Sequence, residues 1–242
     1  MKRVKYLNNR DLLAQIHASK NTYCSYVTPE DSQYDIIVPN LKKLNASAIA
    51  QARKNKAKRL TQEAWEKAKD EGKKKIKLAD YTVSPRKIDK SDLVFRVMMF
   101  DHVPMDGERK RNPKTVADHH TKVNFPPFQH YRIDKKGKNV CVGKSHWIGG
   151  MNNGHFSAEH GKMTNQLALM YMKLCERYGT RANWRGYTYN DEMQSQALMQ
   201  LSQIGLQFDE SKSDNPFAYY TAAITNSFTR ILNIEKKNQT IR

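Results

Sequence analysis

Apolar residues recur at helical spacing in three consecutive segments near the C-terminus of this 242-residue chain. They predict a helix from Thr164 to Gly179 and a second helix over residues 191–207. Thr188 lies three residues before Asp191, which is the spacing of a capping box. An Asn-Pro pair at 215–216 predicts the start of a third helix, because proline is tolerated in a first helical turn.

The third helix carries aromatic residues on more than one face. Its inner stripe is expected to pack in a core and consists of Phe217, Tyr220, Ile224, Phe228 and Ile231. The opposite stripe consists of Tyr219, Ala223, Asn226 and Arg230. An exposed tyrosine beside amide and cationic side chains offers a stacking surface for an unpaired base and donors for phosphate. Packing remains the alternative for the outer aromatic.

The rest of the chain predicts fewer regular elements. Residues 4–20 favour a short helix capped near Asn8 or Asn9, and residues 45–77 favour a long basic helix. Residues 93–100 predict a strand, and DKKGK between HYRI and NVCVG predicts a β-hairpin. We therefore expect a mainly α fold, in which a helical bundle carries a basic insertion of mixed α/β structure. The expected division is 1–30 for an N-terminal helix, 31–160 for the insertion, with a β-containing segment at 91–150, and 161–242 for the helical domain.

Lysine and arginine total 42 against 24 for aspartate and glutamate, a formal charge of +18. Such an excess favours an anionic partner, and nucleic acid is expected because no apolar run approaches the roughly 18 residues of a membrane span. The N-terminus lacks signal-peptide features, and the three cysteines are far apart, so a cytoplasmic protein with reduced thiols is expected. The cations that could contact phosphates from the basic helix are Lys54, Lys56, Lys58 and Arg59. A merely solvated helix face is the alternative.

Several short motifs occur in a fixed order in the last 80 residues. They are Gly186-Tyr187-Thr188, Glu192-Met193, Leu206 to Glu210 (LQFDE), Asn215 to Thr221 (NPFAYYT) and Asn226-x-Phe228. With them, residues 164–242 resemble region 2 of the sigma-70 superfamily, most closely the late-transcription sigma factors of large myovirus-type bacteriophages. The N-terminal stretch VKYLNNRDLLAQI is similar to the start of those phage factors. No counterpart is recognised for residues 30–160.

The resemblance implies a sigma factor that directs a multisubunit bacterial RNA polymerase to late promoters in an infected host cell. Such a protein is not an enzyme and needs no cofactor. The second helix would bind the coiled coil of the polymerase beta-prime subunit through Glu192, Met193, Ser195, Gln196 and Met199. The third helix would recognise a minus-ten-like element and hold the melted non-template strand. Its DNA-binding residues would be Tyr219, Ala222, Ala223, Asn226, Arg230, Lys236, Lys237 and Arg242, with Tyr219 stacking on a flipped base.

The chain departs from the family pattern in two respects. Ala222 and Ala223 stand where bacterial housekeeping factors carry a tryptophan pair, so a smaller stacking surface is expected. No short acidic-hydrophobic motif for binding a sliding clamp follows the third helix, so dependence on a clamp or a phage coactivator is in doubt. No helix-turn-helix for a minus-thirty-five element is expected either.

Two other functions are left open. Asp118-His119-His120, Asn124 and His146 could form a metal nuclease site of the His-Asn-His type, in which histidines serve as base and ligands. The charge alone would also suit a general RNA- or DNA-binding protein without sigma activity.

Overall fold

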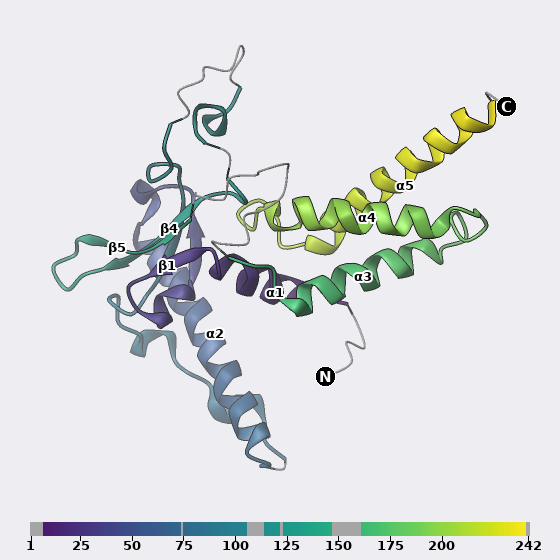
Figure 1. Ribbon diagram of the computed structural model, residues 1–242. Coiled ribbons are helices and arrows are strands. Elements are labelled where there is room, and N and C mark those ends of the chain that lie inside the picture. Colours follow the sequence, from purple (N-terminus) through teal and green to yellow (C-terminus); the bar gives the residue numbers. More distant parts are fainter. Residues whose placement is uncertain (1–6, 74, 106–113, 122, 147–160, 241–242) are drawn as a thin grey trace. The chain divides into compact units, whose positions relative to one another are not determined.

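The computed structural model describes residues 7–73, 75–105, 114–121, 123–146 and 161–240 (Figure 1). They form two compact units. The helical unit comprises the described residues of Met1–Tyr23, Lys122–Pro126 and His146–Arg242. The mixed unit comprises those of Cys24–Thr121 and Pro127–Ser145. The first change of unit therefore falls after Tyr23, seven residues before the end of the expected N-terminal segment.

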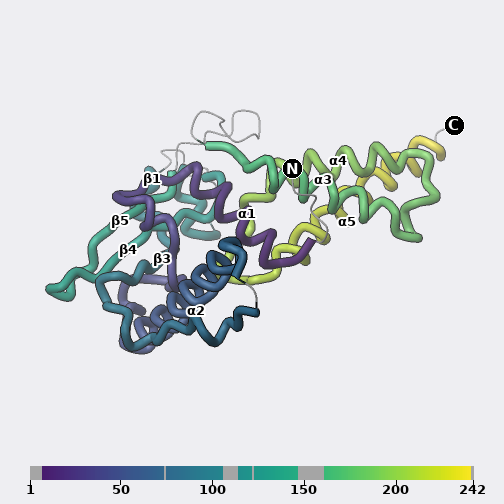
Figure 2. Tube along the Cα trace, turned by 90° about the horizontal axis from the view of Figure 1, so that it is seen from below, coloured from purple at the N-terminus to yellow at the C-terminus, as the bar shows by residue number. Residues whose placement is uncertain are grey.

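The helical unit consists of α1 (Asn9–Asn21), α3 (Asn165–Gly179), α4 (Asn190–Ile204) and α5 (Pro216–Thr240). In both Figure 1 and Figure 2, α3 lies alongside α4, and α4 lies alongside α5. The side chains of Asn8, Thr164 and Asn215 cap α1, α3 and α5, which confirms three predicted helix starts. The capping box at Thr188 was wrong, because α4 begins after Tyr189 without a side-chain cap.

Four helices bury one side each to form the core of the helical unit. Fully buried side chains include Leu12, Ile16, Leu167, Tyr171, Met193, Leu201, Tyr220 and Phe228. Tyr171 donates a hydrogen bond to Tyr220 (3.0 Å), which donates to the carbonyl of Gly205 (2.9 Å). A Cβ at Gly205 would lie 2.1 Å from the Tyr171 hydroxyl, so only glycine permits this close approach. The two buried phenols are therefore satisfied by the turn that ends α4.

The mixed unit contains a five-stranded sheet in the order β1-β5-β4-β3-β2. Its strands are β1 (Cys24–Tyr26), β2 (Ile36–Val38), β3 (Phe95–Met98), β4 (Phe128–Ile133) and β5 (Asn139–Ser145). The β4–β5 hairpin is confirmed, and Asp134 and Lys138 close its turn with a 2.8 Å backbone hydrogen bond. Strands β2 and β3 are parallel, and α2 (Ala46–Asp70) lies in the connection between them. Short 3₁₀ helices span Pro29–Ser32, Leu41–Lys43, Leu78–Tyr81, Pro85–Lys87, Val116–His119 and Gly205–Gln207, the last in the helical unit.

Helix α2 packs its small residues against the sheet. Ala52 and Ala57 belong to one buried cluster with Phe95 of β3 and Ile133 of β4. Near the β3–β4 pair, Arg96 is 1% exposed, and its guanidinium lies between the rings of Tyr34 and Phe128, 3.9 and 3.7 Å from their centroids. Arg96 Nε donates to His130 Nε2 over 2.9 Å. This buried cation is a structural part of the unit.

The expectation of a mainly α fold was wrong, because a mixed five-stranded sheet accompanies the helices. Strands β1 and β2 have three residues each, too few to produce an alternating pattern in the sequence. The expected strand at 93–100 is shorter, with β3 covering Phe95–Met98. The expected helix at 45–77 ends at Asp70, where a turn with Gly72 at φ +79° follows.

Candidate nucleic-acid and polymerase interface

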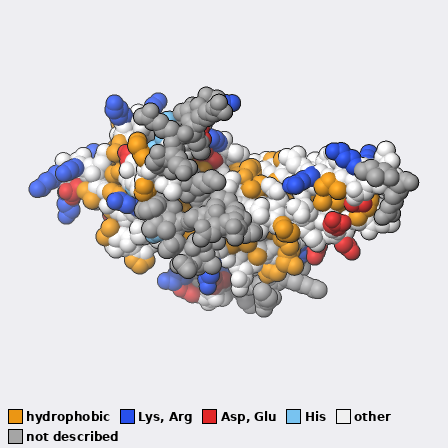
Figure 3. All heavy atoms as spheres, turned by 45° about the horizontal axis from the view of Figure 1, so that its top comes forward, with side chains coloured by type: hydrophobic (Ala, Val, Ile, Leu, Met, Phe, Trp, Pro, Cys, Tyr) orange, Lys and Arg blue, Asp and Glu red, His pale blue; other side chains and the backbone are white. Residues whose placement is uncertain are grey.

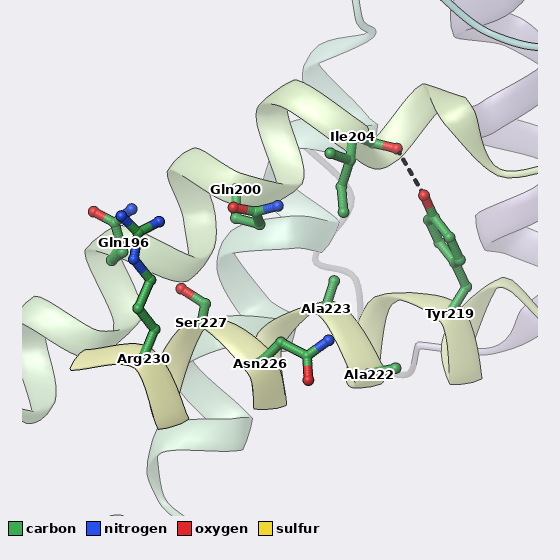
Figure 4. Close-up of a pocket in the computed structure, with 9 residues that line it drawn as sticks. All are labelled: Gln196, Gln200, Ile204, Tyr219, Ala222, Ala223, Asn226, Ser227 and Arg230. Carbon is green, nitrogen blue, oxygen red and sulfur yellow. Dashed lines mark hydrogen bonds between the residues drawn. The ribbon is translucent and has the colours of Figure 1, made fainter. Parts of the chain in front are cut away.

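A groove of about 300 Å³ runs between α4 and α5 (Figure 4). Its lining residues come from these two helices and are Gln196, Gln200, Ile204, Tyr219, Ala222, Ala223, Asn226, Ser227 and Arg230. Five of the eight predicted DNA-binding residues are among them. The structure therefore brings these five predicted residues together on one surface.

The groove follows from helical spacing and from small side chains. Residues 219, 222, 223, 226, 227 and 230 recur every three or four positions and share one side of α5. Residues 196, 200 and 204 do the same on α4. Between them, Ala222 and Ala223 contribute only methyl groups. The helices touch through their cores, and this pair of alanines leaves the space above the contact open.

Tyr219 forms one end of the groove and is half-buried. Its hydroxyl donates to the carbonyl of Ile204 over 3.2 Å, and its ring meets Phe208 edge-on with centroids 5.6 Å apart. Burial raises the pKa of Tyr219, so the phenol stays neutral at physiological pH. The ring is thus fixed in place, while part of its surface remains accessible.

Two residues of α5 differ from their predicted exposure. Ala223 was expected on the outer face and is only 8% exposed, although it lines the groove. Phe217 was expected in the core stripe but is 37% exposed, because it lies in the first turn of the helix. Tyr220, Ile224, Phe228 and Ile231 are buried as predicted.

The predicted polymerase-binding residues divide between three environments on α4. Glu192, Ser195 and Met199 are exposed on one side of the helix, with Met199 at 54%. Gln196 lines the groove on another side. Met193 is 0% exposed, so its assignment as a surface contact was wrong: the side chain packs in the core of the bundle.

A buried ion pair supports the groove from behind and was missed by the sequence analysis. Lys20 of α1 is 1% exposed, and its ammonium group pairs with Glu210 over 2.8 Å. The same group donates to the carbonyl of Phe208 over 2.7 Å. Since Phe208 contacts Tyr219, α1 fixes the segment that carries this aromatic neighbour. The two partners are 190 positions apart, and nothing in the local sequence signals the pairing.

Helix α1 also contacts the start of α5. The side-chain oxygen of Asn9 accepts from the backbone nitrogen of Phe217 over 3.0 Å. Asn215 accepts from Ala218 over 3.1 Å, so two amides satisfy orphan donors of this helix N-terminus. The N-terminal helix is therefore an integral part of the bundle that presents Tyr219.

The remaining predicted DNA-binding residues extend along α5. Lys236 and Lys237 are exposed near its C-terminal end, and Lys237 lines a second hollow with Arg230 and Asn226. Arg242 lies outside the described residues.

The four cations predicted on α2 do not form one free surface. Arg59 pairs with buried Asp35 over 2.8 Å and donates to the carbonyl of Tyr34, and Lys56 donates to the carbonyl of Asp92. Lys54 and Lys58 remain exposed, one turn apart. On the face shown in Figure 3, Lys and Arg side chains are scattered and do not gather in a single patch.

The residues of the nuclease alternative are engaged in local structure. Asp118 accepts from the backbone nitrogens of Lys114 and Thr115, and His120 bonds to the carbonyl of Val116. In the described part of the chain, no three His, Cys, Asp or Glu residues converge to hold a metal ion.

No described helix combines the length and apolarity needed to cross a membrane. No known protein family, curated protein or solved structure matches the chain.

Proposed function

We propose that the protein is a sigma factor that binds a multisubunit bacterial RNA polymerase and directs it to promoter DNA in a phage late programme. The observation that carries this proposal is the division of α4 and α5 into separate working surfaces. Glu192, Ser195 and Met199 project on one side of α4, and the groove with Tyr219 and Arg230 lies on another. One surface is thus available to a protein partner while the other is available to DNA.

The exposed side of α4 suits a protein partner. From Gln194 to Gln207 the segment carries no charged residue, and Met199 is a large exposed apolar side chain on it. A helix of this kind gains free energy by burying such side chains against a second helical structure. The coiled coil of the polymerase beta-prime subunit is the partner that the family resemblance implies.

The exposed side of α5 suits a melted DNA strand. Tyr219 offers a fixed aromatic face, and Arg230 with Lys237 offers positive charge farther along the same helix. Base stacking on an aromatic side chain contributes about 1–3 kcal/mol, which offsets the cost of extruding a base. The polymerase would carry out the chemistry, and this chain would supply promoter selection.

Two variants test the two surfaces separately. Met199→Glu should weaken capture of core polymerase, and Tyr219→Ala should leave capture intact but reduce open-complex formation about tenfold. Ala14→Glu, an equal charge change at an exposed site on α1, is the matched control for capture. Capture is measured by pull-down of purified core polymerase, and opening by permanganate reactivity of thymines on an AT-rich promoter.

The proposal makes a sharp demand on the wild-type chain. It must retain core polymerase and produce initiation at a defined start site, about a helical turn downstream of the recognised element. Sequence-independent DNA or RNA binding with no effect on the polymerase would refute it in favour of a general nucleic-acid-binding protein.

A further inference from the structure

The groove between α4 and α5 is a cavity with walls, which distinguishes it from a flat stacking surface. Its volume of about 300 Å³ exceeds that of one nucleobase and lies at the lower end of small-molecule sites, about 300–1,000 Å³. The space exists because Ala222 and Ala223 end at their methyl groups. Leucine or tryptophan at either position would occupy it.

Hydrogen-bonding side chains line both walls. Gln196 and Gln200 approach from α4 and Asn226 from α5 (Figure 4). Each carboxamide carries both donors and an acceptor, and base edges likewise present adjacent donors and acceptors. The walls can therefore distinguish one base from another, which an aromatic stacking surface alone does poorly.

Ser227 gives independent evidence that the groove accommodates a polar ligand. The residue is 6% exposed and lines the groove, and its hydroxyl has no hydrogen-bond partner among the described residues. In Figure 4 this hydroxyl is directed from α5 toward α4, into the groove. A buried hydroxyl without a partner costs folding free energy, and a ligand atom in the groove would satisfy it.

The ends of the groove complement a nucleotide strand. Tyr219 provides an aromatic face at one end, and the exposed guanidinium of Arg230 provides a phosphate donor at the other. No acidic side chain lines the groove. A single nucleotide extruded from single-stranded DNA would meet a π surface, amides and a cation in turn.

We propose that the groove receives one nucleobase of single-stranded DNA and that Gln196, Gln200 and Ser227 read its edge. This inference rests on the proposed function and adds to it a specificity-determining role for α4. Gln196, which the family resemblance implies as a polymerase contact, becomes a base contact.

The first experiment fills the groove. The full-length chain is titrated with single-stranded oligonucleotides that carry 2-aminopurine at successive positions, and its emission is recorded. One position should show a distinct emission change, and Ala222→Leu should abolish that change and weaken binding about tenfold. Ala218→Leu is the matched control, because Ala218 is also an exposed alanine of α5 but does not line the groove.

The second experiment tests edge reading. Binding constants are measured for oligonucleotides with each of the four bases, or an abasic residue, at the sensitive position. The wild type should discriminate among bases, and Gln200→Leu and Ser227→Ala should each reduce the spread of affinities about fivefold or more. Gln203→Leu, on α4 but outside the groove, should retain the spread. Thermal unfolding should show Ser227→Ala at least as stable as the wild type, so a folding defect would not explain the result.

The outcomes separate this inference from the proposed function. If the chain initiates transcription but Ala222→Leu behaves as Ala218→Leu does, the groove is not a base site, while sigma activity stands. If the chain fails to bind polymerase, the proposed function falls, and the oligonucleotide titration still decides the groove. Equal affinity for abasic and base-containing strands, or preference for RNA of the same sequence, would overturn the inference.

Discussion

Helices α2 and α5 both have 25 residues, yet they are used in opposite ways. Helix α2 buries small residues such as Ala52 and Ala57 and directs Lys56 and Arg59 to partners within its own unit. Helix α5 buries large aromatics such as Tyr220 and Phe228 and leaves polar residues facing a groove. The more basic helix is thus the more structural one.

The comparison shows that cation content alone does not locate an interface. Two of the four predicted cations of α2 are held by carboxylate or carbonyl oxygens, which reduces their availability to phosphate. Arg230 of α5 is exposed beside amides and an aromatic ring, and that combination is more informative than charge. Four changes would break or sharpen this contrast.

The largest effect is expected from the buried ion pair of the helical unit. Lys20→Met leaves Glu210, whose side chain is 6% exposed, without its cation, and should lower the free energy of unfolding by about 4 kcal/mol. Hydrogen exchange should increase in α1, α3, α4 and α5 and stay unchanged in the sheet. Lys162→Met, at an exposed lysine, should change stability by less than about 0.5 kcal/mol. Equal effects of the two substitutions would mean that the pair has no structural role.

A somewhat smaller effect is expected from the ion pair beneath α2. Arg59→Met removes the partner of Asp35, whose side chain is fully buried, and should cost about 3 kcal/mol. Faster hydrogen exchange should appear in α2, β2 and β3. Lys58→Met, at an exposed neighbour, serves as the matched control. If Arg59→Met left exchange unchanged but reduced DNA affinity, Arg59 would be a DNA contact and the contrast between α2 and α5 would fail.

A third change tests whether the two exposed cations of α2 touch nucleic acid. If Lys54 and Lys58 both contact phosphates, replacing both by Gln should reduce the slope of log binding constant against log salt by about 2. Lys56→Gln should leave the slope unchanged, since that ammonium group is bonded to the carbonyl of Asp92. The measurement is a salt titration of DNA binding by the full chain. An unchanged slope for the double variant would identify α2 as a solvated helix.

The smallest effect concerns acid sensitivity of the sheet. Burial lowers the pKa of His102 below its ordinary value of 6.5, partly offset by a hydrogen bond to Ser145. Because the unfolded chain binds the proton more readily, this contribution to stability is complete above pH 6.5 and is lost as the pH falls through the folded pKa. Hydrogen exchange of β5 should therefore accelerate below pH 6.5, and His102→Gln should weaken that dependence. The same acceleration in both chains would assign the effect to another group.

Local sequence determined the helices and their starts. Caps at Asn8, Thr164 and Asn215 and the turn of the β4–β5 hairpin depend on contacts within a few residues, so short patterns predict them. The spacing along α5 likewise placed Tyr219, Asn226 and Arg230 on a common side. These are properties of one helix or one turn, and no distant residue is needed to specify them.

Only the tertiary structure decided the sheet, the supporting role of α1 and the shape of the groove. Strands of three residues carry no readable period, and their pairing depends on segments about a hundred positions away. Lys20 finds Glu210 across 190 residues, and Met193 and Gln196 part company because neighbouring helices cover one side of α4 and not another. Burial is a property of the packed molecule, so the division of α4 between core, groove and exposed surface could not be read from its own residues.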